Sequence, residues 1–154
     1  MTGTYLLADI PIQITSLYDE VHKMCADYRT ELPAHICIST TDEEIEEEGR
    51  MSDQQRKIEG LPSFQFEPSY LETLTIYRKI ATEMMSHGIL LMHGSVIAVD
   101  GEAYLFTALS GTGKSTVVIR RKKDTAEFTH FYHLCYLNIK KRSFQSFTEY
   151  ILTR

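Results

Sequence analysis

Hydrophobic and polar residues alternate over residues 4–14, and this period of two predicts a strand. Its alternating apolar positions are Ile10, Ile12 and Ile14. Because proline has no backbone N–H to donate, Pro11 implies that the strand lies at a sheet edge or starts late. Further along, two isoleucines in phase predict a short strand over residues 35–39.

Two segments carry the apolar face that a packed helix needs. The first runs from about residue 16 to residue 28, with Ser16 and Asp19 as its capping signal. The second begins at a capping box formed by Ser69 and Glu72, and a glycine ends it at residue 88. The apolar stripe predicted for this second helix is Tyr70, Leu74, Tyr77, Ala81, Met84 and Met85, with the methionine pair as core filling.

The segment between these helices, residues 41–60, is strongly acidic. Thr41 and Glu44 have the spacing of a helix cap, but an apolar face is almost absent. We interpret the segment as a solvated helix or a mobile connector; the alternative is an acidic interaction surface.

A β-hairpin is predicted next. Two apolar runs of β-forming residues, 89–99 and 102–108, are joined by Asp100-Gly101, and Asp-Gly between such runs is a strong hairpin signal. The second run leads directly toward a glycine-rich sequence.

That sequence is nearly a phosphate-binding P-loop: Ser110, Gly111, Thr112, Gly113, Lys114, Ser115 and Thr116. The full pattern has an earlier glycine where this chain has Ala108. Gly111 and Gly113 let consecutive amides turn toward phosphate oxygens, Lys114 supplies a cation, and the Ser115 hydroxyl can bind Mg²⁺. The alternative is a glycine-rich turn from strand to helix that contains a lysine by chance.

Together, Met92-His93-Gly94-Ser95, the hairpin and residues 105–116 resemble the catalytic core of HPr kinase/phosphorylase-related proteins. These are P-loop serine kinases whose fold is similar to that of phosphoenolpyruvate carboxykinase. The resemblance covers about residues 86–116, with a weaker echo in the preceding helix.

This resemblance implies an α/β fold in which a hairpin leads into the phosphate loop. It also implies ATP and Mg²⁺ as ligands, held by Ser110–Thr116 with Ser115 on the metal, and a serine of a protein or peptide as the possible acceptor. His93 would lie near the phosphates as a catalytic candidate. The alternative for His93 is a buried strand histidine bonded to backbone.

The chain departs from this family after the P-loop. Such kinases carry an acidic residue about twenty residues further on, which holds magnesium and accepts the proton of the attacking hydroxyl. Residues 128–138 contain no Asp or Glu, and three β-branched residues followed by Arg120-Arg121-Lys122-Lys123 make a poor helix. We therefore expect a kinase-like ATP-binding protein with impaired catalysis. A non-catalytic phosphate-binding module and a general P-loop NTPase are the alternatives.

The charge distribution divides the chain at the same place. Residues 1–116 carry 8 Lys and Arg against 18 Asp and Glu, whereas residues 117–154 carry 8 against 3. We expect an N-terminal α/β region over residues 1–67, a P-loop core over 68–116 and an atypical basic tail over 117–154. A frameshift or premature stop would explain the tail, and the fold would then be incomplete at its C-terminus. A tail that contacts nucleic acid is the less favoured alternative.

The remaining composition is that of an ordinary soluble domain of 154 residues. Neither a signal peptide nor a membrane-spanning run is recognisable, so we expect a cytoplasmic protein. Three widely spaced cysteines, Cys25, Cys37 and Cys135, predict reduced, buried thiols. His130 and His133 suit one face of a helix, but the spacing does not favour a metal site.

Overall fold

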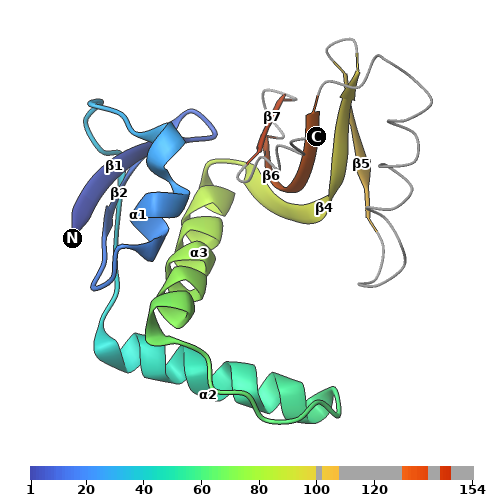
Figure 1. The fold of residues 1–154 in the computed structure, drawn as a ribbon. Coiled ribbons are helices and arrows are strands. Elements are labelled where there is room, and N and C mark those ends of the chain that lie inside the picture. The colour runs from blue at the N-terminus through green and yellow to red at the C-terminus, as the bar shows by residue number, and fades with distance from the viewer. Residues whose placement is uncertain (100–101, 108–129, 139–142, 147–154) are drawn as a thin grey trace, which may run out of the picture. The chain divides into compact units, whose positions relative to one another are not determined.

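A computed structural model of the chain describes residues 1–99, 102–107, 130–138 and 143–146 (Figure 1). It is a mixed α/β protein that divides into two compact units, Met1–His87 and Gly88–Arg154. The division expected from the sequence at residue 67 differs from this one, because helix α3 (Pro68–Ser86) lies within the first unit.

A three-stranded sheet begins the first unit. Its strands are β1 (Thr2–Leu7), β2 (Ile10–Thr15) and β3 (Ile36–Ser39), in the order β1-β2-β3. β1 and β2 are antiparallel, whereas β2 and β3 are parallel. The isoleucines predicted to alternate inward from β2 are all buried, and β3 lies where the sequence predicted it.

The single strand predicted over residues 4–14 is wrong, because the chain reverses at Ala8 and Asp9. Both residues have positive φ, 49° and 66°, and the pairing closes at Leu7 and Ile10. Two central residues with positive φ are the mark of a type I′ hairpin turn, which normally contains Asn or Gly. Ala-Asp carries no such signal, so the alternating pattern hid the turn.

Pro11 does not place its strand at an edge, since β2 is the middle strand of the sheet. The other prediction for this proline, a ladder that starts late, holds on the β3 side, where pairing begins at Ile12 and Ile36. The Pro11 carbonyl still accepts a hydrogen bond from the His35 amide at 2.8 Å. A missing N–H is therefore tolerated at this position.

In place of the long helix predicted over residues 16–28, the chain forms the short helix α1 (Glu20–Met24) and one 3₁₀ turn, η1 (Ala26–Tyr28). The predicted cap is also wrong, since the Asp19 side chain makes no capping hydrogen bond. After η1 the chain pairs with β1: Arg29 bridges Tyr5, and the Thr30 amide donates to the Thr4 carbonyl at 3.0 Å. This pairing ends the helix early and covers part of the β1 edge.

Helix α2 (Asp42–Ile58) confirms the helix prediction for the acidic segment, and Thr41 and Glu44 form the predicted reciprocal capping box. Ile45 and Glu48 are its buried residues, so the helix is mostly solvated, as its weak apolar pattern indicated. Near its middle lies Gly49, where an added Cβ would come within 3.2 Å of the Leu71 side chain. The absence of a side chain there allows α2 to approach α3 closely.

Helix α3 confirms the second helix, but with a different start and a different buried face. It begins with Pro68 in its first turn and has no side-chain cap, so the capping box predicted from Ser69 and Glu72 is wrong. Of the predicted stripe, Met84 is buried, whereas Tyr70 and Met85 are exposed. The buried residues are Leu71, Glu72, Thr73, Thr75, Ile76, Ile80 and Met84.

The end of α3 follows the prediction. His87 is the C-cap residue, and Gly88 adopts a φ of +72°, the left-handed conformation that favours glycine after a helix. In Figure 1, α3 runs beside the first sheet and α1, and α2 crosses near its N-terminal end.

The second unit contains a four-stranded sheet. Its described strands are β4 (Ile89–Val99), β5 (Glu102–Phe106), β6 (His130–Asn138) and β7 (Ser143–Ser146), antiparallel in the order β5-β4-β6-β7. Val99 pairs with Glu102, which confirms the predicted hairpin; its turn, Asp100-Gly101, lies outside the described residues.

Strands β6 and β7 lie in the segment that the sequence analysis treated as an atypical basic tail. The helix face predicted for His130 and His133 is wrong, since both belong to β6. Within the described part of the chain, no helix is both long and apolar enough to cross a membrane.

Candidate functional site

The predicted phosphate-binding residues Ser110, Gly111, Thr112, Gly113, Lys114, Ser115 and Thr116 lie outside the described residues. The strand that precedes them is described: β5 ends at Phe106, and Thr107 follows it. A strand therefore leads toward the glycine-rich sequence, as a P-loop requires.

The His93 candidate lies at an irregularity of β4. On the β6 side, His93 pairs with Leu134 and Val96 with Tyr132, so β4 contains one residue more than β6 over this interval. On the β5 side, Ser95 pairs with Phe106, the last residue of β5. Bulges of this kind are frequent beside active sites, where they change the direction of a side chain.

This arrangement brings the backbone of residues 93–95 next to the end of β5. Ser95, which directly follows the His-Gly sequence, is therefore paired across a ladder with the last residue of the strand that approaches the phosphate loop. The described residues contain no group of three or more His, Cys, Asp or Glu side chains that could hold a metal ion.

In the first unit, Glu72 is a polar centre that the sequence analysis assigned to a helix cap. Its side chain is fully buried and accepts three hydrogen bonds: from the Leu17 amide at 2.7 Å, the Tyr18 amide at 2.9 Å and the Thr40 hydroxyl at 2.5 Å. A carboxylate is an acceptor only, so three donors suit its ionised form. Glu72 thus joins α3 to the loop after β2 and to the end of β3.

A second buried carboxylate, Glu48, joins α2 to α3. Its oxygens accept from the Arg78 guanidinium at 2.9 Å through Nε and 2.9 Å through Nη2. One turn earlier, Glu44 pairs with Lys79 at 2.5 Å, and the Lys79 hydrogen bond lowers the pKa of the Glu44 carboxyl. Since both acids are occupied by helix packing, neither is a free catalytic carboxylate.

A chain of hydrogen bonds connects Tyr5, His22 and Ser16. The Tyr5 hydroxyl lies 2.6 Å from His22 Nδ1, and Ser16 Oγ lies 2.8 Å from His22 Nε2. The Ser16 hydroxyl donates to the Tyr18 carbonyl at 2.5 Å, so His22 donates to Ser16 through Nε2, and in the neutral ring Nδ1 accepts from Tyr5.

Burial lowers the His22 pKa, which favours the neutral ring in this chain of hydrogen bonds. Because its proton is directed to the Tyr18 carbonyl, Ser16 is not arranged as a nucleophile with His22 as its base. No spacing motif connects residues 5, 16 and 22, so the sequence analysis could not find this cluster.

The described cysteines differ in their surroundings. Cys25 is free and fully buried, which confirms the prediction of a reduced, buried thiol there, and burial raises the pKa of its thiol to about 12. Cys37 is exposed, so the prediction of a buried thiol is wrong at that position.

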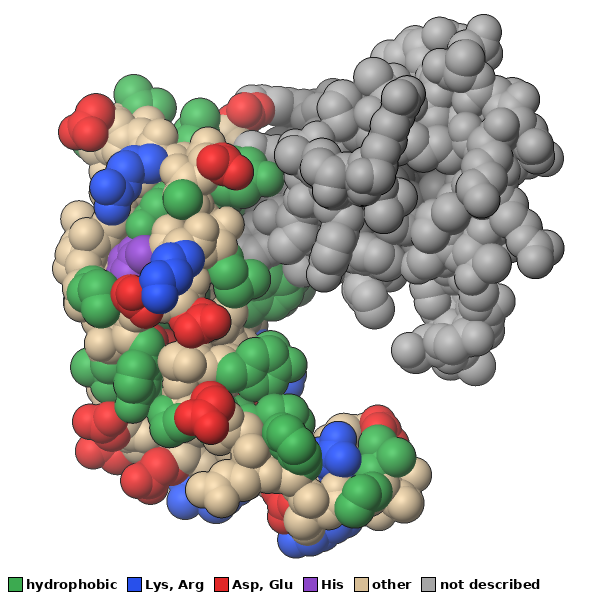
Figure 2. Space-filling view, in the orientation of Figure 1, with side chains coloured by type: hydrophobic (Ala, Val, Ile, Leu, Met, Phe, Trp, Pro, Cys, Tyr) green, Lys and Arg blue, Asp and Glu red, His purple; other side chains and the backbone are tan. Residues whose placement is uncertain are grey.

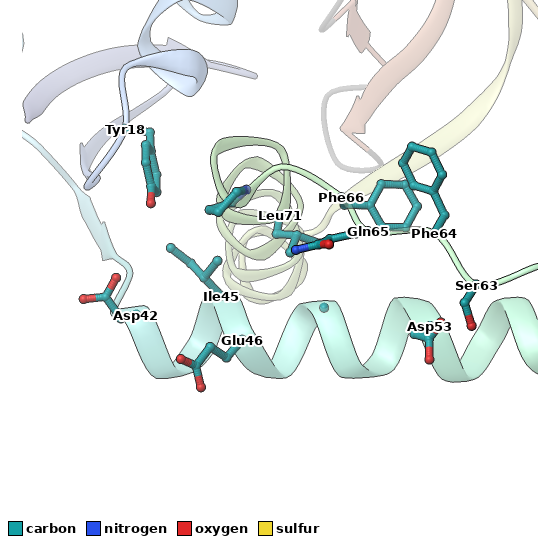
Figure 3. Close-up of a pocket in the computed structure, with 12 residues that line it drawn as sticks. Tyr18, Asp42, Ile45, Glu46, Asp53, Ser63, Phe64, Gln65, Phe66 and Leu71 are labelled. Carbon is teal, nitrogen blue, oxygen red and sulfur yellow. The ribbon is translucent and has the colours of Figure 1, made fainter.

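A groove of about 700 Å³ lies along α2 in the first unit. Ile45 and Gly49 of α2 line it together with Leu71 of α3, and Phe64 and Phe66 line it from the segment that joins the two helices (Figure 3). Acidic residues of α2 also line the groove. It was not predicted, because its walls come together only when the two helices pack.

Comparison with known proteins returned no similarity: no family model matches this chain, and neither a curated protein nor a solved structure matches it.

Proposed function

We propose that the chain binds Mg²⁺-ATP through Ser110–Thr116 and is related to HPr kinase-like serine kinases. The observation that carries this proposal is the backbone in front of the loop. A tight hairpin returns the chain along β4, β5 ends at Phe106, and the bulged residues of β4 lie beside that end. This is the strand context that the glycine-rich sequence needs.

The residues of the loop have distinct roles in this proposal. The amides around Gly111 and Gly113 bind phosphate oxygens, and the Lys114 ammonium neutralises their charge. Mg²⁺, when bound, bridges phosphate oxygens and neutralises their charge, and the hydroxyl of Ser115 is the hard oxygen donor that such an ion accepts. His93 would lie near the phosphates and donate a hydrogen bond to them.

We further propose that phosphoryl transfer is slow or absent. The sequence of β6 contains no Asp or Glu that could accept a proton from an attacking hydroxyl. In the first unit, the buried carboxylates Glu48 and Glu72 are held by neighbouring groups. Binding without turnover is therefore the expected behaviour, and a serine of a protein or peptide remains the proposed acceptor for any residual activity.

The test is a titration with a fluorescent ATP analogue in the presence of Mg²⁺, on the full chain and on Lys114→Ala. We expect the substitution to weaken binding by about a hundredfold or more, since it removes the charge that faces the phosphates. The matched control is Lys122→Ala, which removes the same charge outside the loop and should change affinity by less than about twofold. Equal affinities of the wild type and the Lys114 variant would exclude the proposed site.

A turnover assay separates binding from catalysis. Hydrolysis of ATP to free phosphate, with no labelling of an added serine peptide, would favour a general P-loop NTPase. Transfer of the phosphoryl group to that peptide would favour a kinase. Binding with neither product is the result expected here.

A further inference from the structure

The groove along α2 differs in chemistry from any phosphate site. It runs from Tyr18 at one end, over Ile45, to Phe64 at the other (Figure 3). Its length follows the helix, so an extended chain fits it better than a compact small molecule does. All of its walls belong to the first unit.

Large apolar side chains are exposed along this groove. Phe64 is 58% exposed and Tyr18 is 37% exposed. The Phe64 ring meets the Phe66 ring edge-on at 4.8 Å, which fixes an aromatic platform. Exposed aromatic side chains beside a concave surface are typical of sites where another chain binds.

The charged residues that line the groove are negative, although the Arg56 guanidinium lies over the Phe64 and Phe66 rings, with its carbon 5.7 and 5.9 Å from their centroids. Asp42, Glu46 and Asp53 line the groove, and no Lys or Arg lines it. Asp53 is partly neutralised, because Lys57 lies 2.6 Å away and its hydrogen bond lowers the Asp53 pKa. Asp42 and Glu46 form no ion pair with another described residue, and their spacing places them on one face of α2.

Two like charges one helical turn apart repel each other, and a cation between them removes that repulsion. The first unit as a whole carries 7 Lys and Arg against 16 Asp and Glu, so its field also favours a cationic partner. Acidic side chains gather around the start of α2, beside hydrophobic ones (Figure 2). An anionic ligand such as a nucleotide is disfavoured by the same charges.

We propose that this groove binds an extended peptide segment of a partner protein in which Lys or Arg alternates with apolar residues. The cationic side chains would pair with Asp42 and Glu46, and the apolar ones would pack on Phe64 and against Leu71. The peptide class follows from the charge and from the exposed rings, and it is independent of the nucleotide proposed above.

The test measures binding of the full chain to a fluorescein-labelled nine-residue peptide in which arginine alternates with leucine. Fluorescence anisotropy reports the binding. Two control peptides replace all arginines by glutamate or all leucines by serine. We expect binding of the first peptide only, with an affinity that falls as salt is raised. Equal binding of the serine peptide would overturn the proposal, because it would mean attraction by net charge alone.

Matched variants locate the site. The double variant Asp42→Asn, Glu46→Gln should weaken peptide binding about tenfold. The control double variant Glu43→Gln, Glu47→Gln removes the same charge from α2 outside the groove and should change the affinity by less than about twofold. Phe64→Ser should also weaken binding about tenfold, and Leu61→Ser, an exposed apolar residue that does not line the groove, should not. Equal losses in groove and control variants would overturn the proposal.

A second copy of this chain is the other possible occupant, and sedimentation velocity distinguishes it. Self-association that disappears in Phe64→Ser but not in Leu61→Ser would replace the peptide partner with a homodimer. A monomer at all concentrations, combined with groove-dependent peptide binding, is the expected result.

Discussion

The two compact units use their polar residues in different ways. In Met1–His87, the buried polar side chains hold elements together: Glu72 receives three donors from the loop after β2 and the end of β3, and Glu48 receives a guanidinium from α3. In Gly88–Arg154, the described backbone is a ladder of antiparallel strands, and the polar sequence with recognisable chemistry comes after β5. Buried acids in the first unit are structural, and the candidate chemistry belongs to the second.

The two units also differ in how much of their chemistry can be recognised from the sequence. A phosphate loop is recognisable from a few consecutive residues, because its chemistry depends on adjacent backbone amides. A buried network such as that of Glu72 joins residues 17, 18, 40 and 72, and no local sequence pattern relates them. Substitutions in the buried network of Met1–His87 should therefore lower stability without changing nucleotide affinity. Substitution of Lys114 should lower nucleotide affinity without changing stability.

The largest expected effect on stability is that of Glu72→Gln. An amide has one acceptor oxygen where the carboxylate has two, and its NH₂ would face a backbone donor in a fully buried position. We expect the free energy of unfolding to fall by about 2–4 kcal/mol in urea titrations. Glu83→Gln, at an exposed position of the same helix, should change it by less than about 0.5 kcal/mol.

The affinity of the Glu72→Gln variant for Mg²⁺-ATP, measured under conditions where the variant is folded, tests whether the two units have separate roles. We expect an unchanged affinity. A loss as large as that of Lys114→Ala would mean that the buried network contributes to the nucleotide site, and the division of roles between the units would be wrong.

A smaller loss of stability is expected for Gly3→Ala. A Cβ at residue 3 would lie 2.5 Å from the Tyr5 hydroxyl and 2.9 Å from Cζ, and Tyr5 is fully buried. The ring must shift, which weakens its hydrogen bond to His22, and overpacking of this kind costs about 1–3 kcal/mol. Thermal unfolding of Gly3→Ala should show the loss. Gly60→Ala tests the backbone cost separately, since nothing lies near its Cβ but its φ of +71° disfavours an L-residue by about 1 kcal/mol.

The hydrogen-bonded histidine predicts a pH dependence. Burial lowers the His22 pKa below its usual value of 6.5 in the folded state, so the unfolded chain binds a proton first as pH falls. The free energy of unfolding should therefore decrease as pH is lowered from 7.5 to 6, before most carboxylates titrate. Urea titrations at these two pH values should give a smaller difference for His22→Gln; an equal difference would assign the dependence to another group.

The smallest effect expected is a gain. Ala8 holds a φ of 49°, which an L-residue with a side chain adopts at a cost of roughly 1 kcal/mol. Ala8→Gly removes that penalty but increases the freedom of the unfolded chain, so we expect a net stabilisation of about 0.5 kcal/mol. Chemical denaturation should show a raised midpoint with an unchanged slope; a lowered midpoint would show that packing of the Ala8 methyl matters more than its backbone.

Local sequence signals predicted several elements correctly. Thr41 and Glu44 formed their capping box, Gly88 ended α3, and the Asp-Gly sequence joined β4 to β5, because each signal acts within a few residues. Predictions failed where a distant partner decided the outcome. Glu72 was assigned to a cap from its spacing to Ser69, but donors from the segments that follow β2 and β3 bind it instead.

The candidate sites show the same division. The glycine-rich sequence from Ser110 to Thr116 and the His-Gly of β4 were found from the sequence, and their roles remain predictions. The groove with Phe64 and Glu46 could not be predicted from the sequence. A single exposed phenylalanine or glutamate is common in any solvated segment, so neither residue marks a binding site by itself. Their significance came from lining one groove.

The sequence by itself determined the cap of α2, the end of α3, the hairpin of β4 and β5, the charge imbalance and the candidate phosphate loop. Caps, turns and loop amides need only neighbouring residues, so these features are properties of short segments. Only the tertiary structure decided that β2 is a central strand, which face of α3 is buried, and that Glu48 and Glu72 serve packing. These outcomes depend on hydrogen bonds and buried surface shared by residues far apart in the chain, and their energy exceeds that of local preference.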